Sequence, residues 1–88
     1  MEFKIIFYSE KLIKKDFSKI PKKNLELIFS KLDILSASGL EIWQIKKLNN
    51  YDLCDYRLRV WDFRILFNID SDKNEIVIFR TLHRSKLY

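Results

Sequence analysis

The chain has 88 residues, a net charge of +5 and 48% hydrophobic residues, which predicts one small domain, residues 1–88, with its own core. The single cysteine, Cys54, excludes an internal disulfide, and no apolar run approaches the roughly 18–20 residues of a membrane span. A basic chain of this kind favours a polyanionic partner, either nucleic acid or an acidic protein. We expect such a protein in the reducing cytoplasm, with no membrane contact.

The first half of the chain predicts one strand and two helices. Residues 3–8 are aromatic and β-branched, which is typical of a strand. Ser9 can cap a first helix with apolar residues at helical spacing, and Pro21 ends that helix. A second helix is expected to end before Gly39, the only glycine, and its apolar stripe consists of Leu25, Ile28, Phe29, Leu32 and Leu35.

After Gly39 the apolar period changes to two, which predicts strands. Residues 42–48 are expected to form a strand that leads into an Asn49–Asn50 turn. A hairpin over residues 56–69 turns at Trp61–Asp62, and a polar turn at 71–74 precedes a last strand at 75–82. The order β-α-α-β-β-β-β predicts an α+β fold, with two N-terminal helices packed on one face of a twisted antiparallel sheet.

The hairpin carries the most informative pattern. All five arginines lie between Arg57 and Arg84, whereas ten of the twelve lysines precede residue 50. A turn at Trp61–Asp62 places Arg59 opposite Arg64, on the face that the apolar residues do not use. Like charges directly opposite each other destabilise a sheet, and guanidinium groups are well suited to grip phosphate. The pattern therefore predicts an anion-binding face that points away from the helices.

Three segments together resemble the RelE/ParE superfamily of toxins from type II toxin–antitoxin systems, and the RelE-like branch in particular. They are Lys46-Lys47-Leu48, Tyr56-Arg57-Leu58-Arg59-Val60-Trp61-Asp62-Phe63-Arg64 and the terminal Leu82-His83-Arg84-Ser85-Lys86-Leu87-Tyr88. The resemblance implies a RelE-like microbial RNase fold and a ribosome-dependent endoribonuclease that cleaves mRNA without metal or cofactor, by attack of a 2′-hydroxyl on the scissile phosphate. The implied partners are a cognate acidic antitoxin, mRNA in the ribosomal decoding site, and ribosomal RNA.

The resemblance also implies a set of catalytic residues. Arg57, Arg59 and Arg64 would bind the phosphate and stabilise its transition state. His83, the only side chain of a type that titrates near neutral pH, would act as general acid or base, and Tyr88 would stack on a base or donate a proton. Many RelE-like members have lysines where Arg57 and Arg59 stand. Because arginine does not give up its proton at neutral pH, neither can serve as the base.

A second set of residues is expected to contact RNA without reacting, namely Lys46, Lys47, Trp61, Arg80 and Arg84. Trp61 occupies a turn position where the family commonly has glycine, so it would either widen the loop or offer a stacking surface. Two alternatives stay open. One is a ParE-like toxin that inhibits DNA gyrase without cutting RNA, and the other is an inactive homologue that only binds its antitoxin.

Overall fold

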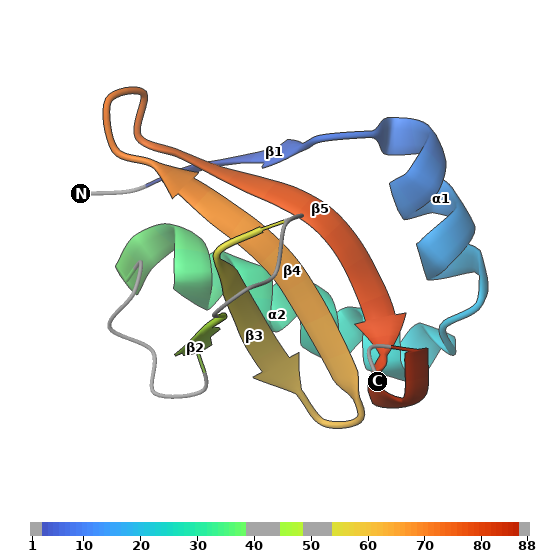
Figure 1. Ribbon diagram of the computed structural model, residues 1–88. Coiled ribbons are helices and arrows are strands. Elements are labelled where there is room, and N and C mark those ends of the chain that lie inside the picture. The colour runs from blue at the N-terminus through green and yellow to red at the C-terminus, as the bar shows by residue number, and fades with distance from the viewer. Residues whose placement is uncertain (1–2, 39–44, 49–53, 87–88) are drawn as a thin grey trace.

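The protein is described by a computed structural model, which covers residues 3–38, 45–48 and 54–86 (Figure 1). The expected Gly39 cap, residues 42–44 of the expected strand, the Asn49–Asn50 turn and Tyr88 lie outside these ranges. The elements in chain order are β1 (Lys4–Phe7), α1 (Glu10–Ser18), α2 (Lys22–Ser38), β2 (Ile45–Lys47), β3 (Tyr56–Val60), β4 (Phe63–Asp70), β5 (Glu75–His83) and a 3₁₀ turn (Arg84–Lys86).

The strands form one sheet in the order β1-β5-β4-β3-β2. β2 to β5 make an antiparallel meander, as expected, and the α+β class with two helices on the sheet is confirmed. The expectation of a wholly antiparallel sheet needs one correction, because β1 runs parallel to β5 and the sheet is mixed. Parallel pairing needs a long connection, and the two helices and the meander between β1 and β5 supply it.

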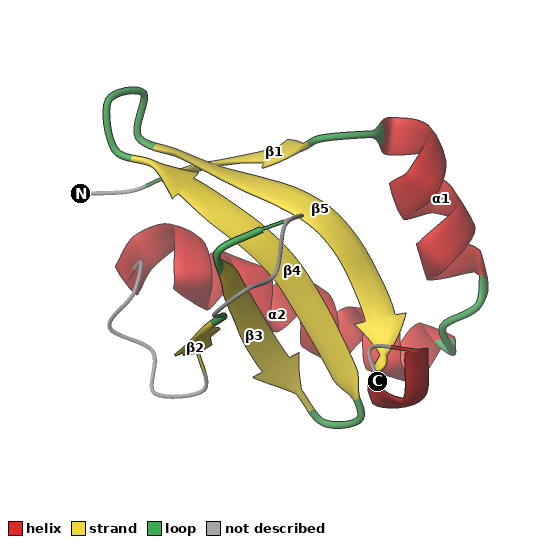
Figure 2. Ribbon diagram, in the orientation of Figure 1, coloured by secondary structure: helices red, strands yellow, loops and turns green. Residues whose placement is uncertain are grey.

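The expected pairing of the β3–β4 hairpin is confirmed in every position. Tyr56 pairs with Phe67, Leu58 with Ile65 and Val60 with Phe63, so one face of the hairpin is apolar. In Figure 2 this sheet has α2 behind it, while α1 lies beside the curved end of β5. Both helices contribute to one core with the inner face of the sheet, through Ile13, Ile20, Ile28, Leu32, Leu35, Leu58, Val60, Phe63, Ile65 and Phe67.

The start of α1 and the break between the two helices follow the expected signals. The Ser9 hydroxyl accepts a hydrogen bond from the Leu12 backbone N–H at 3.3 Å, and Pro21 precedes the first residue of α2. One member of the expected α2 stripe is misplaced: Phe29 is 45% exposed. It packs edge-on against Phe17 at the rim of the core, with ring centroids 5.4 Å apart.

Candidate functional site

The sheet face opposite α2 carries a patch of positive charge, here called the basic face, made of Lys46, Arg57, Arg59 and Arg64. Lys46 comes from β2, the next two residues from β3 and Arg64 from β4. Alternation along each strand places them on the side that the core residues do not use. The expected arginine face is therefore present, and the register adds Lys46 to it.

Two pairs of like charges face each other directly on this surface. Arg59 lies opposite Arg64, and Lys46 lies opposite Arg57. Such pairs are unfavourable on a sheet, because like charges directly opposite each other repel. A bound polyanion would relieve both repulsions at once. The arrangement is chemically suited to binding phosphate through planar, permanently charged donors.

An apolar side chain lies among these charges. Leu66 is fully buried although it belongs to the outer face. Its cross-strand neighbours are Arg57 on β3 and Arg80 on β5. Arginine stems commonly lie along apolar surface while their charged ends stay in water. Leu66 is thus a buried apolar residue between Arg57 and Arg80 on the outer face of the sheet.

Arg64 is held in a defined position by the hairpin turn. Its Nη1 donates to the Trp61 carbonyl at 2.8 Å and to the Phe63 carbonyl at 2.9 Å. The guanidinium therefore bends toward the turn instead of extending across the sheet. A cation that is already oriented before a ligand arrives loses little conformational entropy on binding.

Trp61 departs from ordinary backbone geometry at the tip of the same hairpin. Its φ is 55°, a region that costs a bulky residue free energy and favours glycine. The side chain is 71% exposed, so core packing does not explain the residue. Of the two alternatives for Trp61, the wider loop is not found, because β3 and β4 stay paired up to Val60 and Phe63. A strained, exposed aromatic residue next to a basic face has the properties of a stacking surface.

The end of β5 is tied to this hairpin turn. The Arg84 backbone N–H donates to the Asp62 carbonyl at 2.7 Å. The Arg84 side chain approaches the Asp62 carboxylate at 3.6 Å, with both side chains more than half exposed, so this ion pair contributes little stability. Arg84 therefore lies beside the turn that carries Trp61.

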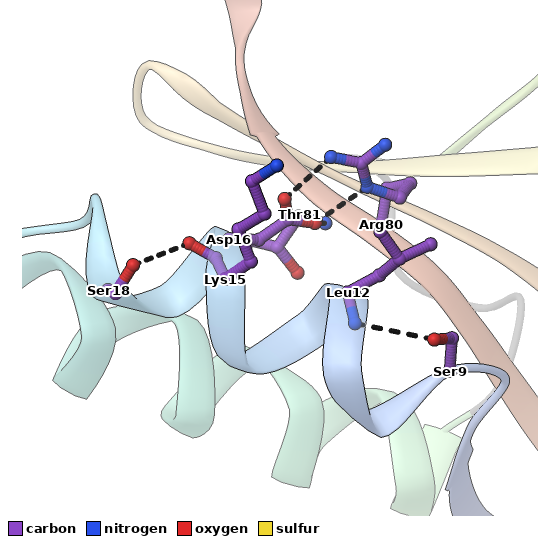
Figure 3. A network of polar contacts seen from close by, with 7 residues as sticks. All are labelled: Ser9, Leu12, Lys15, Asp16, Ser18, Arg80 and Thr81. Atoms are coloured by element: carbon purple, nitrogen blue, oxygen red, sulfur yellow. Dashed lines mark hydrogen bonds and ion pairs between the residues drawn. The ribbon is translucent and has the colours of Figure 1, made fainter.

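Arg80 makes a two-bonded ion pair with Asp16 (Figure 3). Its Nε and Nη2 donate to the two carboxylate oxygens of Asp16 at 2.8 and 2.7 Å, and the Thr81 backbone N–H donates to the same carboxylate at 3.1 Å. An irregularity in the β4–β5 register, opposite Leu66 and Phe67, brings Arg80 to the outer face, although alternation from Ile78 would have placed it in the core. Asp16 is buried, so Arg80 joins α1 to β5 and is not simply a solvated RNA contact.

The structure does not bring all expected site residues together. His83 pairs with Phe63, a core residue, so its ring lies on the opposite side of the pleat from the basic face. Lys47 pairs with Tyr56 and likewise alternates away from Lys46. Tyr88 lies outside the described residues. The cations expected on β2, β3 and β4 therefore lie on one face of the sheet, with the exception of Lys47. The expected acid–base residue His83 lies on the other side.

Two features escaped sequence reasoning. Asp16 falls three residues after Ile13 and four before Ile20, on the buried stripe of α1, and a carboxylate at such a position signals a buried partner. The second feature is a cavity of about 660 Å³ at the end of β5, partly lined by Thr81 and His83. Its walls come from segments far apart in the chain, so no local pattern could have predicted it.

The described residues offer neither an activated thiol nor a group of metal ligands. Burial raises the pKa of the Cys54 thiol above its ordinary value, so it is not an activated nucleophile. Within residues 3–38, 45–48 and 54–86, no group of three or more His, Cys, Asp or Glu side chains could hold a metal ion. None of the described helices is long and apolar enough to cross a membrane.

Neither a family model nor a curated protein matches this chain. Solved structures do match, among them three that cover nearly the whole chain. The RelB–RelE antitoxin–toxin complex from Methanococcus jannaschii is 26% identical with a TM-score of 0.72, and 94% of each chain is covered. The RelBE2 toxin–antitoxin complex from Mycobacterium tuberculosis is 24% identical with a TM-score of 0.79, and the match covers 96% of this chain and 100% of the matched chain.

The RelE–RelB complex from the archaeon Pyrococcus horikoshii is 21% identical with a TM-score of 0.75, and the match covers 98% of this chain and 99% of the matched chain. The matched chains are the RelE toxins of these complexes. The expected resemblance to RelE-like toxins is therefore confirmed, and the fold is that of RelE.

Proposed function

We propose that this RelE-like chain is the toxin of a toxin–antitoxin pair and a ribosome-dependent endoribonuclease that cleaves mRNA. The observation that carries the proposal is the direct opposition of Arg59 and Arg64 on the exposed face of the sheet. The fold shared with the RelE chains of three antitoxin complexes supports the same assignment. By analogy with those complexes, an acidic antitoxin binds this chain in the cytoplasm.

The proposed reaction uses the RNA's own nucleophile. The 2′-hydroxyl attacks the adjacent phosphorus and loses its proton, and the bond from phosphorus to the 5′-oxygen breaks as that oxygen gains a proton. The products are a 2′,3′-cyclic phosphate and a 5′-hydroxyl. Negative charge builds up on the phosphoryl oxygens in the transition state, and Arg57, Arg59 and Arg64 stabilise it. One preorganised donor of this kind is worth about 10²–10³ in rate.

The chemistry of the described basic face supports ribosome dependence. Its cations are arginines and Lys46, and arginine cannot act as a base near neutral pH. His83 lies on the other side of the pleat, so we do not place it at the scissile phosphate. The described residues of this face offer charge stabilisation and no histidine base, and such a site gains most when an external surface aligns the 2′-hydroxyl with the phosphorus. The ribosomal decoding site supplies that alignment for mRNA.

The test is primer-extension mapping of mRNA in a translating extract. Wild type, Arg59→Ala and Arg64→Ala are compared with Lys73→Ala, which removes one exposed charge from the β4–β5 turn. We expect ribosome-dependent cuts with wild type and the control, and at least about 10²-fold slower cutting with either arginine variant. Intact mRNA together with altered DNA supercoiling would favour a gyrase inhibitor. Intact mRNA and unaltered supercoiling, with antitoxin binding retained, would indicate an inactive homologue.

A further inference from the structure

The cavity at the end of β5 lies beside the basic face but is not part of it. It measures about 660 Å³, within the range of about 300–1,000 Å³ that is usual for ligand sites, and lies where the end of α1 and the α1–α2 connection meet β5 and the 3₁₀ turn. Leu82, one of its lining residues, is the cross-strand partner of Arg64. Thr81 and His83 line the cavity from the opposite side of the pleat, so a chain bound along the basic face reaches it around the edge of β5 at Leu82, beyond the end of the pairing with β1 at Ile78.

A buried hydroxyl in the cavity wall lacks a partner. Thr81 is only 2% exposed, and its Oγ1 has no hydrogen-bond partner among the described residues. Its backbone N–H is already occupied by the Asp16 carboxylate. A buried hydroxyl without a partner is unfavourable, and most such groups in folded proteins are satisfied. A hydroxyl can donate and accept, so it suits a ligand edge that carries either kind of group.

His83 forms a second, oriented wall. The Ser85 backbone N–H donates to His83 Nδ1 at 3.2 Å, and the Ser85 hydroxyl lies 2.9 Å from the same nitrogen. Because Nδ1 accepts, the proton of the neutral ring is on Nε2. The ring also stands perpendicular to Phe63, with centroids 5.5 Å apart. The cavity thus combines aromatic surface with a fixed imidazole that can hydrogen-bond.

The charge around the cavity is positive. Lys19 and Lys86 line it, while Asp16, the one carboxylate among its described lining residues, is neutralised by Arg80. The preferred ligand is therefore anionic, with a flat ring that has a polar edge. A nucleotide has all three properties. An acidic side chain of a partner protein would satisfy the lysines but would leave the two rings and the Thr81 hydroxyl unused.

We propose that this cavity binds one unpaired nucleotide of the RNA, with its base against Phe63, its polar edge at Thr81 and His83, and its phosphate between Lys19 and Lys86. The proposal rests on the proposed nuclease function and extends it. The basic face holds the scissile phosphate, and the cavity holds a nucleotide next to it. His83 then contributes to recognition of a base, and the enzyme has a nucleotide preference of its own.

The first test uses the free, full-length protein and four probes, the ribonucleoside 5′-monophosphates, with inorganic phosphate for comparison. Amide resonances in ¹H–¹⁵N spectra should shift saturably at Thr81, His83 and Ser85, with tighter binding for at least one nucleotide than for phosphate. Thr81→Val removes the hydroxyl and should weaken binding about threefold to tenfold, whereas Thr81→Ser should retain it. Lys86 is exposed, so Lys86→Ala does not disturb the core, and it should weaken the binding of nucleotides and of phosphate alike.

The outcomes separate this proposal from the nuclease assignment. Equal binding of phosphate and all nucleotides, or no weakening in Thr81→Val and Lys86→Ala, overturns the nucleotide site. In the cleavage assay, Thr81→Val should change which nucleotides flank the cuts, and an unchanged pattern with Arg64-dependent cutting overturns the site while the nuclease stands. Nucleotide binding at Thr81 in a protein that cuts no RNA supports the site and rejects the nuclease.

Discussion

Asp16 in α1 and Arg80 in β5 are 64 positions apart in the chain, yet they form a two-bonded ion pair with distances of 2.8 and 2.7 Å. The Asp16 carboxylate also accepts the Thr81 backbone N–H. The pairing of β5 with β1 ends at Ile78. The ion pair fixes α1 against the part of β5 that lies beyond this point. A helix and a strand edge are thereby joined by one carboxylate.

Removal of one member of this pair should be costly. Arg80→Ala leaves the Asp16 carboxylate buried without its cation, and we expect the free energy of unfolding to fall by about 3–5 kcal/mol. Urea unfolding followed by circular dichroism measures the change. Arg80→Lys keeps the charge but loses the two-point geometry, so it should fall in between. If Arg80→Ala and wild type unfold at the same urea concentration, the pair is not structural.

The β3–β4 hairpin could be predicted in detail because its information is local. Alternation from Tyr56 to Val60 and from Phe63 onward, with Leu66 as the one apolar residue on the outer face, predicts which face each side chain takes, and the position of the turn then fixes the register. The opposition of Arg59 and Arg64 follows from these two facts alone. The arginine pattern could therefore be interpreted without any tertiary information.

The positions of Arg80 and His83 could not be predicted in the same way. An irregularity in β5 changes the face of every residue beyond it, and no residue in the segment marks its place. Alternation that ignores this irregularity assigns Arg80 to the core. It then gives no basis for predicting the side of the sheet on which His83 lies. The cavity depends on the same irregularity and on the docking of α1, which is a tertiary event.

Salt should stabilise this protein. Lys46–Arg57 and Arg59–Arg64 are like-charged cross-strand pairs, and the chain has a net charge of +5. Between about 10 mM and about 150 mM salt the Debye length falls from about 30 Å to about 8 Å, which weakens repulsion between exposed charges. The melting temperature should rise over this range. A variant with Lys46→Thr and Arg59→Thr should respond less, and an equal response would locate the repulsion elsewhere.

Trp61 should be replaceable by glycine with a gain in stability. Its φ of 55° costs about 1–3 kcal/mol, whereas glycine adds only about 0.4–1 kcal/mol of unfolded-chain entropy. We expect Trp61→Gly to raise the free energy of unfolding by about 1 kcal/mol, measured in urea. RNA binding should weaken, because the exposed ring is lost. Asp62→Gly is the control, since its φ is not positive and glycine there should destabilise. A destabilised Trp61→Gly variant would mean that the ring packs against the fold.

The Cys54 thiol should react slowly in the folded protein. Burial raises its pKa, and alkylating reagents attack only the thiolate. At pH 8 the labelling rate with iodoacetamide should be far below that of the urea-unfolded chain. The folded thiol has a higher pKa than the unfolded one, so ionisation of Cys54 favours the unfolded chain at high pH. The stability that the neutral thiol contributes is therefore fully present below the unfolded pKa and is lost as pH rises through the folded pKa. Equal labelling rates with and without urea would contradict the burial.

Arg59→Thr should make the protein more stable and less active at once. Threonine suits a strand and removes the repulsion with Arg64, so the free energy of unfolding should rise by about 0.2–1 kcal/mol. Cleavage should fall by about 10²-fold, because one donor to the phosphate is lost. Lys73→Ala, which removes a charge that faces no like partner across the described strands, should change neither quantity. If Arg59→Thr lowers stability, Arg59 is held by a favourable contact in the free protein, and the repulsion between it and Arg64 no longer argues for a bound phosphate.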